Sequence, residues 1–133
     1  METMTGQISR DRSYRIHEAG LILMDTSVKS APPLFSIFAP TWDMVKGVKD
    51  GVLPYTDIAY TEADYTRDYR KMMVNSWKTR QRQWREIMGK NGVYVVSCYC
   101  PEGAFCHRHL LHGMFGEISQ KYNLPYHYYG EFK

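Results

Sequence analysis

The segment from Cys98 to Arg108 holds the densest group of reactive side chains in the sequence. It carries Cys98, Cys100 and Cys106, followed directly by His107 and Arg108. Thiols, an imidazole and a guanidinium can bind an anion, coordinate zinc or provide a nucleophile. The spacing of these residues and the elements around them are therefore the first clue to function.

An anion site is the first interpretation of this segment. The run Val93–Val96 is typical of a buried strand, and an amphipathic helix begins near Cys106. The unpaired amides at a helix N-terminus attract phosphate or carboxylate groups, and Arg108 could add a bidentate contact. The alternative is that Arg108 forms an ordinary ion pair with a neighbouring carboxylate.

A zinc site is the second interpretation, because three thiolates and one imidazole can close a tetrahedron. The spacing argues against it. One residue separates Cys98 from Cys100, Cys106 and His107 are adjacent, and Cys106 is expected to pack inward with the helix. The sequence therefore predicts no residue as a metal ligand, and the cofactor is unknown from the sequence.

A cysteine nucleophile is the third interpretation, since a thiol at a helix N-terminus near an arginine can ionise at neutral pH. The phosphate loop of cysteine phosphatases has its arginine six positions after the nucleophile. Here Arg108 follows Cys100 by eight positions. His107, His109 and His112 all follow on the same helix, with nothing to rank them as a base.

A second polar group follows the apolar run Leu21–Met24, which is expected to form a buried strand. Asp25 ends that strand, where a carboxylate can bind hydroxyls of a ligand or act on it. It could equally form a turn with the residues that follow it, since Asp-Thr-Ser is favourable turn chemistry. If the two strands are parallel, Asp25–Thr26 and Cys98–Cys100 meet at one edge of the sheet.

Strands and helices alternate along the rest of the chain. Helices are expected at Trp42–Lys49, after the helix start at Pro40–Thr41, and at Thr61–Gly89, with a bend near Asn75–Ser76. Residues 34–38 suggest a brief strand or packed loop, and residues 126–132 a last strand. This order predicts an α/β fold, a small Rossmann-like domain with a mostly parallel sheet flanked by helices.

Composition limits the classes of protein. The 133 residues suit a single domain over residues 1–133, with residues 1–13 expected to be a loose tail. No segment predicts a membrane span or signal peptide, and three clustered cysteines do not suit a disulfide framework, so a cytoplasmic location with free thiols is expected. The net charge of +3 favours an anionic ligand but is too small to predict nucleic-acid binding.

Three sets of residues resemble a known family. These are Met24–Ser30, Phe38–Val45, and Cys98–Cys100 together with Cys106–Leu111. The chain resembles the phage and bacterial branch of domain of unknown function 488 over about residues 20–115. The resemblance implies a small Rossmann-like domain whose marked positions are Asp25, Cys98, Cys100, Cys106, His107 and Arg108. It also implies that Thr41 and Trp42 wall the pocket.

The expected function is binding of a nucleotide-like or other phosphorylated small molecule at the C-terminal edge of the sheet. If a bond is cleaved, Asp25 or Glu102 is the candidate base or nucleophile. The ligand-binding residues are predicted to be Thr26, Lys29, Trp42, Cys98, Tyr99, Cys100, Cys106, His107 and Arg108. Two alternatives remain open: a phage protein in the host cytoplasm that sequesters a signalling nucleotide without turnover, and a zinc-stabilised interaction module. A homo-oligomer is compatible with either.

Overall fold

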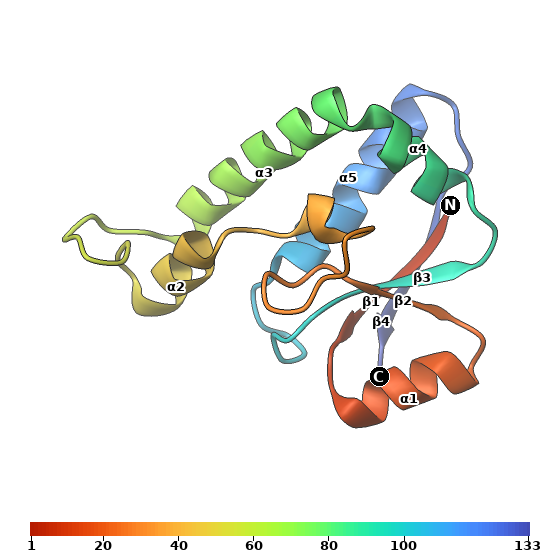
Figure 1. Cartoon of the computed structure of the whole chain (residues 1–133), viewed down its shortest axis with the longest axis horizontal. Coiled ribbons are helices and arrows are strands. Elements are labelled where there is room, and N and C mark those ends of the chain that lie inside the picture. The colour runs from red at the N-terminus through yellow and green to blue at the C-terminus, as the bar shows by residue number, and fades with distance from the viewer.

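Two apolar runs form the pair of parallel strands that the sequence predicted. In the computed structural model, which describes residues 1–133, β2 (Ile22–Asp25) pairs with β3 (Val93–Cys98). The full sheet has four strands in the order β2-β3-β1-β4, all parallel. With five helices packed around it, this is a small Rossmann-like α/β fold, as expected (Figure 1).

The prediction of a loose tail at residues 1–13 is wrong. Residues Glu2–Gln7 form β1, which lies between β3 and β4 (His127–Phe132). Thr3 and Thr5 are buried although threonine is polar, so the hydropathy of this segment did not indicate a buried strand. Their hydroxyls are 2.7 Å from the hydroxyls of Tyr126 and Tyr128, so polar residues are buried here with their hydrogen bonds made.

Short polar side chains set the starts of the next helices. Ser9 accepts a hydrogen bond from the Arg12 amide and begins α1 (Arg10–Glu18). Thr41 caps α2 (Trp42–Asp50) in the same way, and Gly51 ends that helix. Residues Ser36–Phe38, where a strand or loop was expected, form a single 3-10 turn.

The long helix predicted over residues 61–89 is two helices. Thr61 begins α3 (Glu62–Thr79), and the chain turns at Arg80 before α4 (Gln81–Gly89). A straight helix over this span would extend roughly 42 Å, beyond the sheet it has to cover. The turn instead lets the buried Trp84 indole donate a hydrogen bond of 3.0 Å to Ser76. The break at Arg80 therefore lies about one helical turn after the bend expected near Asn75–Ser76.

Helices cover both faces of the sheet. In Figure 1, α1 lies on one face, while α3, α4 and α5 (His107–Lys121) lie on the other. Phe38 is central to the larger core, because its ring meets Trp84 edge-on at 4.8 Å and Phe115 at 5.3 Å between ring centroids. None of the helices combines the length and apolar character needed to cross a bilayer.

We predict that Gly6→Ala lowers the free energy of unfolding by about 1–3 kcal/mol, because the added methyl group overpacks the sheet. A Cβ atom at Gly6 would lie 2.8 Å from Cγ1 of Val95. Gly113→Ala is the matched control, since a Cβ there meets nothing within 4 Å on α5. That control should stabilise the protein by up to about 1 kcal/mol. Urea denaturation checks both, and equal stability of the two variants would contradict the placement of β1.

Candidate functional site

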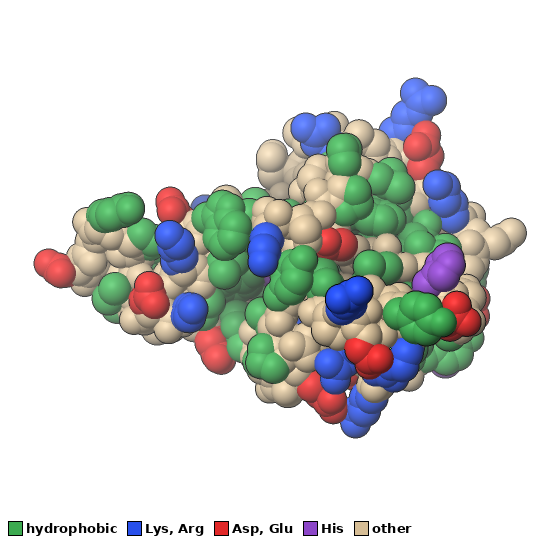
Figure 2. All heavy atoms as spheres, turned by 60° about the horizontal axis from the view of Figure 1, so that its bottom comes forward, with side chains coloured by type: hydrophobic (Ala, Val, Ile, Leu, Met, Phe, Trp, Pro, Cys, Tyr) green, Lys and Arg blue, Asp and Glu red, His purple; other side chains and the backbone are tan.

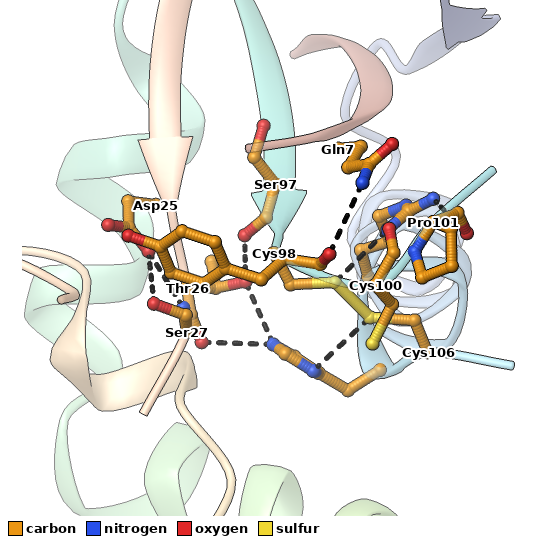
Figure 3. The surroundings of a disulfide bond; sticks show 12 residues. Gln7, Asp25, Thr26, Ser27, Ser97, Cys98, Cys100, Pro101 and Cys106 are labelled. Atoms are coloured by element: carbon orange, nitrogen blue, oxygen red, sulfur yellow. Dashed lines mark hydrogen bonds between the residues drawn. A yellow bond between two sulfur atoms is a disulfide. The ribbon is translucent and has the colours of Figure 1, made fainter. Parts of the chain in front are cut away.

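The candidate site lies at the C-terminal ends of β2 and β3. Asp25 and Ser97 are paired in the register of these two strands. Just beyond that pair, the amide and the hydroxyl of Thr26 both donate to the Ser97 carbonyl, at 3.0 and 2.9 Å. The sheet therefore brings the Asp25–Ser27 turn beside the cysteine segment, at the edge where the sequence placed the site (Figure 3).

Asp25 organises the first turn. One of its carboxylate oxygens accepts hydrogen bonds from the amide and hydroxyl of Ser27, at 2.9 and 2.7 Å. The other accepts from the Ser30 hydroxyl at 2.5 Å, and that hydroxyl is also 2.8 Å from the Tyr99 hydroxyl. Of the two roles proposed for Asp25, these contacts match the turn. A catalytic role for Asp25 stays a prediction.

Arg108 is completely buried and faces the loop backbone. Its Nη1 donates to the Cys100 carbonyl at 2.7 Å and to Sγ of Cys98 at 3.1 Å, while Nη2 lies 3.4 Å from the Pro101 carbonyl. Its Nε lies 3.2 Å from a carboxylate oxygen of Glu131 on β4. The structure thus matches the ion-pair interpretation of Arg108, although the pair is buried and not the ordinary surface pair that the sequence suggested.

His107 is held in one orientation under the same loop. Its Nε2 lies 2.9 Å from the Thr26 carbonyl oxygen and 3.0 Å from the Thr26 hydroxyl. Burial lowers the pKa of His107 to about 4, so the ring is neutral at physiological pH. Because a carbonyl oxygen only accepts, Nε2 carries the proton and Nδ1 is left as an acceptor, 3.7 Å from Sγ of Cys106.

The three cysteine sulfurs converge within 4.8 Å of one another. A disulfide joins Cys98 to Cys106, whereas the sequence predicted three free thiols; Cys100 is free and half-buried (Figure 3). Sequence reasoning expected Cys106 to pack away from the other two. The loop between Cys100 and Cys106 instead folds back through Gly103, whose φ of 81° suits glycine. Burial raises the pKa of the Cys100 thiol, which disfavours Cys100 as a ready nucleophile.

A pocket of about 610 Å³ opens beside this cluster. Lys29 and Lys49 contribute basic groups to its wall, and the half-exposed rings of Trp42 and Tyr99 contribute aromatic ones. Glu62 adds one carboxylate. On the face drawn in Figure 2, basic and acidic side chains are interspersed among hydrophobic ones, with no large patch of one charge. Two lysines and two aromatic rings in one wall suit an anionic ligand that carries an aromatic ring.

The N-terminus of α5 also opens into this pocket. Phe105, Cys106 and His107 line it, and the Cys106 side chain makes no capping hydrogen bond. The first amides of a helix have no partner within the helix, and here no side-chain cap replaces one. They carry the partial positive charge of the helix end toward the pocket.

The pocket includes some of the predicted residues and leaves out others. Of the predicted ligand-binding residues, those that line it are Lys29, Trp42, Cys98, Tyr99, Cys100, Cys106 and His107. Thr26 and Arg108 are buried beneath it. Asp25 lies next to the wall at Ser27, and Glu102 is exposed in a 3.3 Å ion pair with Lys133. The structure therefore does not bring the two candidate catalytic carboxylates together.

Two important residues escaped the sequence argument. Lys49 was treated only as the end of a helix, although the helical spacing from Trp42 to Lys49 places both on one face. Glu131 carries no local signal, because it meets Arg108 only through the pairing of distant strands. Helical spacing could have identified Lys49, but no local pattern could have identified Glu131.

Comparison with known proteins identifies one family. Residues 33–119 match the family model described as the active DUF488-N3 subclade. No curated protein and no solved structure matches the chain.

We predict that Glu131→Gln lowers the free energy of unfolding by about 3 kcal/mol, because it leaves the buried guanidinium of Arg108 without its counter-charge. Glu117→Gln is the matched control. Glu117 pairs with Arg70 at 3.1 Å on the surface, so that change should cost less than about 1 kcal/mol. Urea denaturation measures both. Similar losses in the two variants would show that the buried pair matters no more than an exposed one.

Proposed function

The chain belongs to the DUF488 family, and from that premise we propose that it binds a nucleotide-like or other phosphorylated small molecule in the pocket at the C-terminal edge of the sheet. The observation that carries the proposal is the uncapped N-terminus of α5, which opens into a pocket that also holds two lysines. Helix N-termini of this kind bind phosphate groups through their backbone amides. Open α/β folds bind ligands at this edge.

The phosphate of the ligand lies between the helix end and the lysines. Neither Lys29 nor Lys49 forms an ion pair in the structure, so both ammonium groups are available to an anion. Lys29 already lies 5.0 Å from the centroid of the Tyr99 ring, which keeps this charge over the pocket wall. Glu62 offsets one positive charge and disfavours ligands with several phosphates.

The base of the ligand stacks on an aromatic ring. Trp42 is 51% exposed and Tyr99 42% exposed, although both line the pocket. Large aromatic rings that stay accessible at the rim of a pocket provide flat surfaces for a planar ligand. Arg108 takes a different role from the one that the sequence suggested. In this proposal it holds the loop in shape from below and does not contact the phosphate.

Binding without turnover and hydrolysis differ in one observable. Asp25 and Glu102 are both engaged outside the pocket, by serines and by Lys133 respectively, so the geometry supports binding more directly than cleavage. Native mass spectrometry of the freshly purified cytoplasmic protein distinguishes the two. An intact ligand that is released unchanged indicates sequestration, and accumulation of a cleaved product indicates an enzyme.

We predict that Lys49→Gln weakens binding of adenosine monophosphate about tenfold, the loss expected for one charge-assisted hydrogen bond. Lys46→Gln is the matched control, because Lys46 lies on the same helix and does not line the pocket. Isothermal titration calorimetry measures both variants, with inorganic phosphate as a second probe that lacks the base. Trp42→Ala should weaken the nucleotide but leave phosphate unchanged. Equal affinities for Lys46→Gln and Lys49→Gln would refute the proposed phosphate position.

A further inference from the structure

The sulfur cluster in the wall of the pocket has a fourth donor, a ring nitrogen that the proposed ligand does not use. Cys98, Cys100 and Cys106 bring three sulfurs within 4.8 Å, and Nδ1 of His107 faces Sγ of Cys106 at 3.7 Å. The fold-back of residues 101–105 brings the three sulfurs together, and His107 joins them through its contact with Cys106. The close spacing of these residues in the sequence argued against a metal site. In the folded chain it does not keep the sulfurs from meeting.

His107 is prepared as a metal ligand by its other nitrogen. Metal-binding histidines usually donate the second ring N–H to a carboxylate or a backbone carbonyl, which orients the ring and directs the free lone pair at the metal. His107 makes this contact to the Thr26 carbonyl at 2.9 Å. Its ring is 4% exposed, and Sγ of Cys106 is the only hydrogen-bond partner of Nδ1. A buried acceptor thus faces the Cys106 sulfur and has no other partner.

The distances agree with a zinc site once the disulfide is reduced. With Zn–N near 2.0 Å and Zn–S near 2.3 Å, a tetrahedral ion separates nitrogen from sulfur by about 3.5 Å. The observed distance from Nδ1 to Sγ of Cys106 is 3.7 Å. The Cα atoms of Cys98 and Cys106 are 7.6 Å apart, wider than the roughly 4.4 to 6.8 Å usual across a disulfide, which leaves room for an ion between the thiolates.

We propose that the reduced protein binds one zinc ion through Cys98, Cys100, Cys106 and His107, in a closed structural site that fastens the end of β3 to the start of α5. Arg108 supports this site, since its Nη1 already donates to Sγ of Cys98 at 3.1 Å and would stabilise a thiolate there. Four protein ligands leave no position for substrate. The ion therefore does not bind the anion itself, although its four ligands also line the pocket, and it goes beyond the function proposed above.

The two states of the cluster are related by a balanced reduction. A phosphine takes an oxygen atom from water and becomes the phosphine oxide. Its electron pair breaks the bond between Cys98 and Cys106, and the two protons of the water complete two thiols. Zinc then binds as the three thiols lose their protons. His107 loses none, because Nδ1 is already free of a proton.

Cobalt titration of the full chain tests the site. The protein is reduced with a phosphine, freed of metal with a chelator and titrated with Co²⁺ under nitrogen. We expect intense thiolate-to-cobalt charge transfer and the visible absorption of tetrahedral Co²⁺, saturating at one equivalent and lost when Zn²⁺ is added. Weak octahedral absorption, or none, would overturn the proposal. So would equal cobalt uptake by the oxidised chain.

The half-buried Cys100 provides the sharpest variant, because its replacement disturbs the core least. Cys100→Ser should lose about one third of the charge-transfer intensity and bind cobalt at least tenfold more weakly, since two thiolates remain. Lys46→Gln, which keeps all three thiols and lies outside the pocket, should match the unaltered chain, and circular dichroism verifies that both variants fold. Unchanged cobalt binding by Cys100→Ser would contradict the ligand set. The nucleotide proposal is judged separately, on Lys49 and Trp42.

Discussion

The buried guanidinium of Arg108 is the interaction on which the arrangement of the site depends. It joins three elements, because it contacts the Cys98 sulfur at the end of β3, the Cys100 carbonyl in the loop and Glu131 on β4 while its own backbone lies in the first turn of α5. A buried charge is costly unless a counter-charge and hydrogen bonds compensate it. Any shift of the loop or of β4 would remove one of these partners, so the guanidinium restricts the loop to a narrow range of conformations.

The sequence predicted the elements whose apolar patterns are simple. The strands that became β2 and β3 are short apolar runs, and α2 and α5 carry clear helical spacing with recognisable starts. It failed at β1, where buried Thr3 and Thr5 are balanced by tyrosine hydroxyls from the far end of the chain. Hydropathy cannot anticipate such burial, because the tyrosine hydroxyls that offset the cost of burying the threonines are more than 120 residues away.

The location of the site was predictable for a topological reason, whereas its internal contacts were not. Two parallel strands with polar residues at their C-terminal ends had to bring those residues to one edge, and Asp25 pairs with Ser97 in register. The direction in which Arg108 points depends on Glu131, whose strand is added at the opposite side of β1. Side-chain direction at the start of a helix is thus decided by tertiary pairing that residue spacing does not encode.

The loop from Tyr99 to Phe105 connects the two proposed sites. Its outer side lines the anion pocket through Tyr99, Ala104 and Phe105, and its carbonyls are held from beneath by Arg108. An ion that joins Cys98, Cys100 and Cys106 would restrict the same loop. It would lower the conformational freedom that a pocket ligand must otherwise remove, so each should favour the binding of the other. This coupling is reciprocal. It follows from the shared loop and from the start of α5, where the backbone amides proposed for the phosphate belong to the same short segment as the side chains proposed for the metal.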